Sequence, residues 1–318
     1  MNDDNLPIRI PSGDIIPVEN NIDALIDRFI AVQDIKQRSK DSYRNSLQQY
    51  FIWVAKKGMS LQNITRVEIL LYKTEMAKQG KSMLTVGAYL TVVRRFYEWA
   101  EALKLYPNVA KDIKTPKRKQ AFKKEGLQPL QVTELLNHFK KEGSLRDYAI
   151  INLMVRTGLR TIEVERLLVG DILFKGGKRV LMIHGKGHDE KDAFVLLTEK
   201  AYLPIKEYLA TRENVIDKSP VFISMSSNGT MGDAIDSKYI SQIAKKGLVA
   251  IGLDGKQYTA HSLRHTASVN LLRSGATLEA VSKVLRHASI STTQIYTKSI
   301  DDEMRILNNT EGLLDDMY

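Results

Sequence analysis

A basic segment that begins with a proline interrupts the chain about a third of the way along its 318 residues. It opens at Pro107, is broken again at Pro116, and contains only Asp112 and Glu125 to offset its charge. Its basic side chains are those of Lys111, Lys114, Lys117, Arg118, Lys119, Lys123 and Lys124. So many charges cannot enter a hydrophobic core, and proline breaks a helix. The sequence therefore predicts two domains joined by a basic linker over residues 107–126.

Residues 21–106 show the hydrophobic spacing of a helical domain. Apolar side chains recur at intervals of three and four residues, which is typical of helices that bury one face. The predicted helices cover residues 22–30, 43–54, 67–77 and 82–103. Ser39 or Asp41 is the expected N-cap of the second helix. The preceding residues 1–20, which include three prolines, are predicted to form an N-terminal tail.

After the linker, helical and β patterns alternate, so residues 127–318 are predicted to form a second domain of mixed structure. Residues 179–184 and 193–197 are rich in branched side chains and flank a polar turn with glycines, which predicts a β-hairpin. The expected helices cover residues 132–139, 146–155, 162–168, 199–211, 238–250, 262–274, 278–285 and 291–296. The predicted fold is mainly α-helical with a small antiparallel β-sheet.

The net charge of the chain indicates which class of molecule it binds. The chain has 47 Lys and Arg against 37 Asp and Glu, a net charge of +10. This balance is expected of a protein that neutralises nucleic acid, although a soluble enzyme that is merely basic is the alternative. The absence of cysteine excludes disulfides, thiol catalysis and zinc sites built on cysteine. The N-terminus is acidic and no apolar run approaches the roughly 18 residues of a membrane span, so we expect a cytoplasmic protein without membrane contact.

Two groups of basic residues are candidate DNA contacts. They are Lys81, Arg94 and Arg95 in the helical domain and Lys114, Lys117, Arg118 and Lys119 in the linker. Cations spaced along an extended segment suit a phosphate backbone, and a linker between two domains can close them around a duplex. The alternatives are a solvated helix face for the first group and a solubilising linker for the second.

Two short motifs of the second domain set cations beside polar partners. In the motif TGLRTIE, Arg160 follows a glycine and Glu163 comes three residues later. This spacing fits an ordinary ion pair on a helix, or an arginine that is presented to a phosphate and held by Glu163. His261 and Arg264, three residues apart, would share a helix face and could grip one oxyanion. His261 and His265 also resemble half of a zinc site, but without the intervening glutamate of metalloproteases.

Three further residues carry little information singly. Lys186 lies between two glycines at the tip of the predicted hairpin, where a lysine is ordinarily solvated. His287 and Tyr296 are nine residues apart across a helix start rich in serine and threonine. A lone tyrosine is most often a core or surface aromatic residue.

The order of these motifs carries more weight than any one of them. The succession TGLRTIEVERL, a GKG hairpin, HSLRHT and LRHASISTTQIYTK closely resembles the catalytic domain of tyrosine recombinases, the phage-integrase and Xer-type family. The resemblance covers residues 130–299 in detail, and the helical domain resembles that family's core-binding, SAM-like domain. It implies an α+β catalytic domain after the helical one. Arg286 departs from the family pattern, which usually has glycine there, and this extra cation is expected to touch DNA or to face solvent.

The resemblance implies that Tyr296 is a nucleophile, which forms a 3′-phosphotyrosine and leaves a free 5′-hydroxyl. A phenol with a pKa of about 10 must lose its proton during attack, and His261 is the expected base. The leaving 5′-oxygen needs a proton, for which Lys186 is the expected general acid.

Negative charge on the phosphate must be held during this attack, and arginines donate in pairs from a planar fork. Arg160 and Arg264 are the expected clamp, His287 is a further donor, and Glu163 orients the cations. We expect no cofactor, because the cations supply the Lewis-acid role and each cleavage exchanges one phosphodiester for another.

Recombination needs four strand exchanges, so we expect a homo-tetramer on two synapsed duplexes that each carry a specific recombination site. Accessory DNA-bending or directionality proteins are possible partners, since a reversible reaction takes its direction from DNA topology or differential binding. Residues 300–314 are expected to form an apolar helix that packs on a neighbouring protomer or on its own domain. Integration or excision of a mobile element, resolution of multimers and inversion all stay open. The rival functions are a type IB topoisomerase and a DNA-binding protein with a spent active site.

Overall fold

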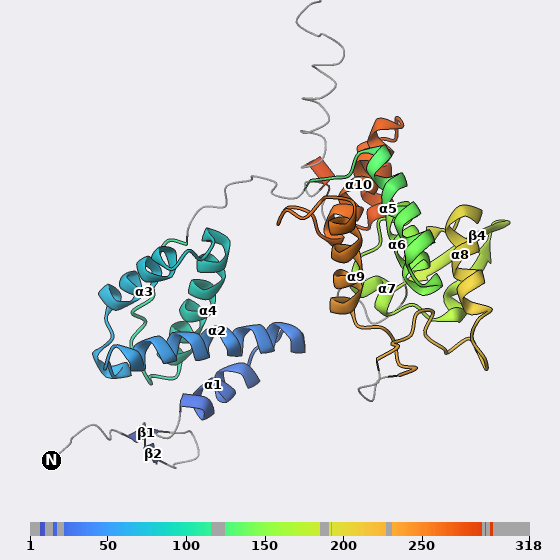
Figure 1. The fold of residues 1–318 in the computed structure, drawn as a ribbon. Helices are drawn as coiled ribbons and strands as arrows, with labels where there is room; N and C mark the ends of the chain where they lie inside the picture. Colours follow the sequence, from blue (N-terminus) through green and yellow to red (C-terminus); the bar gives the residue numbers. More distant parts are fainter. Residues whose placement is uncertain are drawn as a thin grey trace, which may run out of the picture. The chain divides into compact units, whose positions relative to one another are not determined.

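The computed structural model describes residues 7–9, 15–17, 22–115, 125–184, 191, 193–226, 231–287, 290 and 293–294. The chain divides into two compact units, residues 1–120 and 121–318 (Figure 1). The predicted fold class is confirmed, since the structure is mostly helical with a small antiparallel sheet in the second unit.

The first unit is a helical bundle whose helices match the predicted ones closely. Its elements are β1 (Pro7–Arg9), β2 (Ile15–Pro17), α1 (Ile22–Ala31), α2 (Gln37–Lys56), the 3-10 helix η2 (Leu61–Asn63), α3 (Arg66–Lys78) and α4 (Met83–Ala102). The strands β1 and β2 pair antiparallel, so the expected tail contains a short hairpin. The expected N-cap of α2 was wrong: the N–H groups of Ser39 and Lys40 already donate to the carbonyl of Lys36, so the helix has begun before Ser39.

The core of the first unit is aromatic and extends beyond the four helices. Tyr50 of α2 and Tyr97 of α4 are buried and share a hydrogen bond of 2.9 Å between their hydroxyls. Ala110 and Ile113 are also buried in this core. Residues 107–115, expected at the start of the linker, thus belong in part to the first unit, because two apolar side chains anchor a segment that is otherwise charged.

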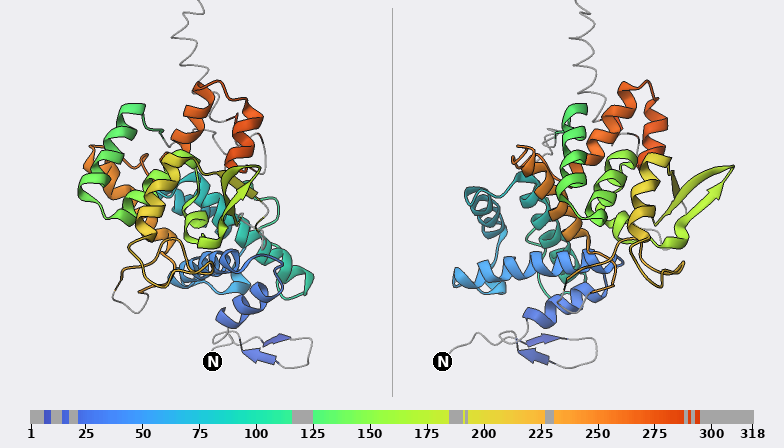
Figure 2. Two further views of the ribbon diagram at one scale, coloured as in Figure 1. Left: turned by 90° about the vertical axis from the view of Figure 1, so that its right-hand side faces the viewer. Right: turned by 45° about the vertical axis from the view of Figure 1, so that its right-hand side comes forward.

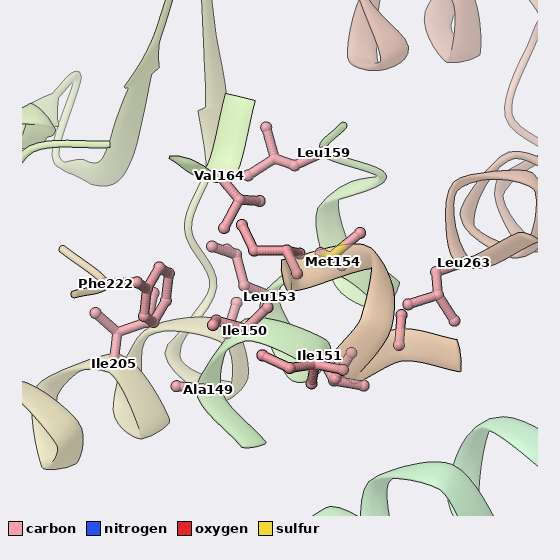
Figure 3. Packing of buried hydrophobic residues seen from close by; sticks show 14 of the residues in the cluster. Ala149, Ile150, Ile151, Leu153, Met154, Leu159, Val164, Ile205, Phe222 and Leu263 are labelled. Atoms are coloured by element: carbon pink, nitrogen blue, oxygen red, sulfur yellow. The ribbon is translucent and has the colours of Figure 1, made fainter. Parts of the chain in front are cut away.

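The second unit surrounds one central helix, α6. Its elements are α5 (Pro129–Glu142), α6 (Leu145–Thr157), α7 (Thr161–Glu165), the 3-10 helix η3 (Val169–Asp171), β3 (Ile172–Lys175), β4 (Lys178–Ile183), β5 (Ala193–Leu196), α8 (Glu199–Leu209), α9 (Ser237–Ala250), α10 (Ala260–Arg273) and α11 (Leu278–Leu285). Buried residues of α6 pack between Ile205 of α8 and Leu263 of α10, as Figure 3 shows. The helix therefore fixes the positions of the elements on both of its sides.

The strands β3, β4 and β5 form one antiparallel sheet, which lies at an edge of the helices of this unit (Figure 2). The predicted hairpin is confirmed, with Val180 opposite Leu196 and Ile183 opposite Ala193. The sequence prediction missed β3. Near the end of the hairpin connection, Lys191 forms an ion pair with the buried Asp171 of η3.

Candidate functional site

Arg160 lies at a sharp turn between α6 and α7. The helix α6 ends at Gly158, whose φ of 64° lies in the left-handed region that favours glycine. A Cβ at Gly158 would lie only 2.6 Å from the side chain of Leu285, so the close approach of α11 also requires glycine. Arg160 is then the N-cap of α7, and 28% of its side chain is exposed. The turn therefore brings this arginine to the surface of the unit.

Glu163 lies beneath Arg160 and is fully buried. Its Oε1 accepts from Arg160 Nη1 at 2.8 Å, and its Oε2 accepts from the backbone N–H of Arg160 and from Nη2 of Arg286, each at 2.8 Å. Burial would raise the pKa of this carboxyl, but the charge and hydrogen bond of Arg286 and the contacts of Arg160 outweigh it and lower the pKa of Glu163. Glu163 is therefore an ionised bridge between two arginines.

Arg264 joins two chain segments that are far apart in the sequence. It is buried on α10, and its guanidinium donates to the carbonyl of Gly158 at 2.6 Å and to the carbonyl of Leu285. Gly158 lies two residues before Arg160, and Leu285 lies two residues before His287. The contacts of Arg264 thus hold both of these residues near α10.

His287 follows the end of α11 and is half-buried. Its Nδ1 shares a hydrogen bond of 2.7 Å with the hydroxyl of the buried Thr293. Burial lowers the pKa of His287 to about 4, and neighbouring positive charges act in the same direction. In decreasing order of effect, these charges belong to Arg264, Arg160, His261 and Arg286. His287 is therefore neutral near pH 7 and lies among the cations that the sequence singled out.

The chain that enters the second unit packs on α10 and on Tyr258 just before it. The N–H of Leu127 donates to the hydroxyl of Thr266 at 2.7 Å, and the carboxylate of Glu125 accepts from the hydroxyl of Tyr258 at 2.7 Å. A Cβ at Gly126 would lie 2.8 Å from Nδ1 of His265, so glycine is needed for this close contact. Residues 125–127 are thereby fixed to the helix that carries Arg264.

The structure brings together four of the six residues expected to carry chemistry. Arg160, Arg264 and His287 gather where α6, α10 and α11 approach one another, and His261 lies exposed on the first turn of α10. Lys186 and Tyr296 lie outside the described residues.

Of the two expectations for Arg286, exposure to solvent was wrong, while contact with DNA stays a prediction. Only 10% of its side chain is exposed, and it pairs with Glu163 instead of facing solvent. Sequence reasoning missed this contact because the two residues are 123 positions apart. It also missed Thr293, for which the run of serine and threonine beside His287 was the available signal.

The candidate DNA contacts are spread over the first unit. Arg95 is exposed beside Tyr43, Lys81 is half-buried over the ring of Tyr89, and Lys114 is exposed. Arg94 is half-buried, and Lys117, Arg118 and Lys119 lie outside the described residues.

The described part of the chain has neither a membrane-spanning helix nor a cluster of metal ligands. No described helix has both the length and the apolar character needed to cross a membrane. Within the same residues, no three or more histidine, aspartate or glutamate side chains form a group that could hold a metal ion, and the His261–His265 pair gains no third ligand.

Family models match both units of the chain. The model of the phage integrase family covers residues 125–303, and the model of the phage integrase N-terminal SAM-like domain covers residues 22–104. The tyrosine recombinase XerC of Pelobacter propionicus is 32% identical over 271 residues, which are 83% of this chain and 86% of that protein. The tyrosine recombinase XerD of Halalkalibacterium halodurans is 31% identical over 300 residues, 91% of this chain and 96% of that protein.

Solved structures share the fold at lower sequence identity. The XerH site-specific recombinase bound to a palindromic difH substrate, a post-cleavage complex, aligns with a TM-score of 0.71 and 20% identity over 96% of this chain and 98% of that chain. A lambda integrase dimer bound to a COC′ core site aligns with a TM-score of 0.66 and 17% identity over 86% of this chain and 76% of that chain.

Proposed function

The chain belongs to the phage integrase family of tyrosine recombinases, which cleave and rejoin DNA, and from this premise we propose that it recombines specific DNA sites through a 3′-phosphotyrosyl intermediate. The observation that carries the proposal is the gathering of Arg160, Arg264 and His287 at the junction of α6, α10 and α11. Two arginines and a histidine gathered in this way, with Arg160 partly exposed, suit an anionic phosphate.

Arg160 and Arg264 are the proposed phosphate clamp. Negative charge on the non-bridging oxygens repels an incoming nucleophile, and positive guanidinium groups offset that repulsion in the transition state. Arg264 is already held by two backbone carbonyls, so its position costs little reorganisation when DNA binds. His287, neutral near pH 7, acts as a hydrogen-bond donor instead of a third full charge.

In the proposed cleavage step, the hydroxyl oxygen of Tyr296 attacks phosphorus and the bond from phosphorus to the 5′-oxygen breaks. The phenol proton passes to His261, which is exposed on the first turn of α10. Lys186 gives a proton to the departing 5′-oxygen. Rejoining is the reverse, with the 5′-hydroxyl of a partner strand as nucleophile. One phosphodiester is exchanged for another, so no nucleotide hydrolysis is needed.

The proposed assembly is a homo-tetramer on two duplexes, because a complete recombination event exchanges four strands. The first unit supplies non-specific phosphate contacts through Lys81, Arg94, Arg95 and Lys114, and the basic residues of 117–119 continue them. The biological result is integration or excision of a mobile element, or resolution of DNA multimers. Accessory proteins that bend DNA would set the direction.

The test is covalent capture. Duplexes selected from a random library by binding are nicked near the expected cleavage point, so that the cut strand diffuses away, and the products are separated on a denaturing gel. We expect an adduct with the intact protein and none with Tyr296→Phe. Adduct that persists in Tyr296→Phe would refute Tyr296 as nucleophile. Relaxation of supercoiled DNA without strand exchange between two marked duplexes would instead identify a topoisomerase.

A further inference from the structure

Arg286 adopts a backbone conformation that disfavours every residue with a Cβ. It ends α11 with φ 53° and ψ 50°, in the left-handed region. Glycine adopts this conformation without steric cost, whereas an L-residue crowds its own carbonyl oxygen. An arginine here carries a cost in backbone strain, which a contact of its side chain can offset.

The side chain of Arg286 makes that contact inside the unit. Its Nη2 lies 2.8 Å from Oε2 of Glu163, and its Nη1 donates to the carbonyl of Val284 at 2.7 Å. Only 10% of the arginine side chain and none of the glutamate side chain is exposed, so water screens the pair weakly. Arg286 also makes the largest favourable electrostatic contribution to the ionised form of Glu163.

The consequence falls on Arg160. A carboxylate with two open oxygens binds an arginine through both forks of the guanidinium. Here Oε2 of Glu163 accepts from Nη2 of Arg286 and from the backbone N–H of Arg160, and Oε1 accepts from Nη1 of Arg160. Because Oε2 is engaged in this way, Glu163 binds the Arg160 guanidinium only through Oε1. It therefore fixes one edge of the guanidinium and does not draw both of its edges inward, away from the protein surface.

We propose that Arg286 is a positioning residue, which acts through Glu163 to hold Arg160 in the orientation that binds the reacting phosphate. This inference rests on the proposed function and adds a residue to it. The ion pair with Glu163 also explains why an arginine is found at a position where glycine would remove the backbone strain. The side chains of Arg286, Glu163 and Arg160 together carry a net charge of about +1, which favours an incoming anion.

The test compares Arg286→Gly with Lys283→Ala in the full-length protein. Arg286→Gly removes the side chain at a position where glycine suits the backbone, so the variant should fold, which far-UV circular dichroism checks. Lys283→Ala removes an exposed cation from the same helix and serves as the matched control. The readouts are the dissociation constant for the selected duplex and the rate of adduct formation at saturating protein.

We expect Arg286→Gly to slow adduct formation about 10- to 100-fold, as a misplaced catalytic group does, while the dissociation constant changes less than about twofold. Arg286→Lys, which keeps the charge but not the planar fork, should give an intermediate rate. Lys283→Ala should leave the saturated rate unchanged. A rate for Arg286→Gly within about twofold of the unaltered protein, or a change in binding alone, would overturn the proposal.

A double-mutant cycle separates positioning from direct contact with DNA. Because Arg286 acts through Glu163, Arg286→Gly should add nothing to the slowing caused by Glu163→Gln. Equal slowing in both backgrounds would show that Arg286 acts independently and would refute the inference. If Glu163→Gln does not fold, Arg160→Lys replaces it, with the same expected loss of the Arg286 effect. Failure of the unaltered protein to form any adduct would instead contradict the proposed function, so the two failures are distinguishable.

Discussion

Replacing Gly158 with alanine tests how the turn before Arg160 is built. Two costs combine at this position. The φ of 64° costs an alanine about 1–2 kcal/mol in backbone strain. The new Cβ would lie 2.6 Å from Leu285 Cδ2 and 3.4 Å from Ala267 Cβ, and overpacking of this kind costs about 1–3 kcal/mol. The expected loss in the free energy of unfolding is therefore about 2–5 kcal/mol.

Gly176 supplies the matched control. Its φ of 58° imposes the same backbone strain, but no atom lies within 4 Å of a Cβ built there. Gly176→Ala should therefore cost about 1–2 kcal/mol, and the difference between the two variants isolates the contact with Leu285. Because Leu285 accepts a hydrogen bond from Arg264, its displacement by Gly158→Ala should also slow adduct formation.

Tryptophan fluorescence can follow the unfolding of the first unit separately from that of the second. Both tryptophans, Trp53 and Trp99, belong to the first unit, so their fluorescence follows that unit in a urea titration. Far-UV circular dichroism follows the helices of both units. Gly158→Ala should lower the midpoint of the dichroism change assigned to the second unit and leave the fluorescence midpoint in place. The steric reasoning fails if Gly158→Ala costs no more than Gly176→Ala.

Two further predictions concern the histidines. Thr293→Val removes the hydroxyl that shares a hydrogen bond with His287 Nδ1, so the imidazole loses the partner that fixes its tautomer. Adduct formation should slow about tenfold, with little change in DNA binding. An unchanged rate would contradict this role of Thr293. The pKa of the buried His265 is lowered to about 4, below its ordinary 6.5, so the unfolded chain binds more protons between these values. His265 should therefore lower the free energy of unfolding as the pH drops from 6.5 towards 4, by up to about 1.4 kcal/mol per pH unit. Above pH 7 the contribution of His265 to the free energy of unfolding should not change with pH. Urea midpoints of the second unit at pH 7 and pH 5, for the unaltered protein and His265→Gln, measure this contribution; an equal fall in both proteins would exclude His265 as its source.

Local patterns in the sequence were sufficient to predict most of the helices. Hydrophobic spacing located each α-helix of the described part of the first unit, because each one buries a single face against the same core, whereas the 3-10 helix η2 was missed. The strand β3 was missed although Gly176 and Gly177 link it to β4 in a tight turn, a signal that two adjacent glycines between branched runs usually provide. The segment after Pro107 was assigned by its charge, whereas the burial of Ala110 and Ile113 decides where it packs.

The residues of the candidate site could be singled out by type, but their contacts could not be predicted. The order of the motifs identified Arg160, Arg264 and His287, and the structure places them together. No local rule shows that Arg264 donates to a carbonyl 106 residues earlier in the sequence, or that Arg286 reaches Glu163 across 123 residues. Such contacts depend on which helix ends meet in the folded core, and that is decided by packing over the whole unit.

The attachment of residues 125–127 to α10 has a mechanical consequence. The chain enters the described part of the second unit at Glu125, and residues 125–127 contact Tyr258, His265 and Thr266 in turn. Thr266 lies two residues from Arg264, and the ring of His265 between them is pressed against Gly126. If both units hold one duplex, as the proposed function requires, tension along the connection reaches α10 within one helical turn of Arg264.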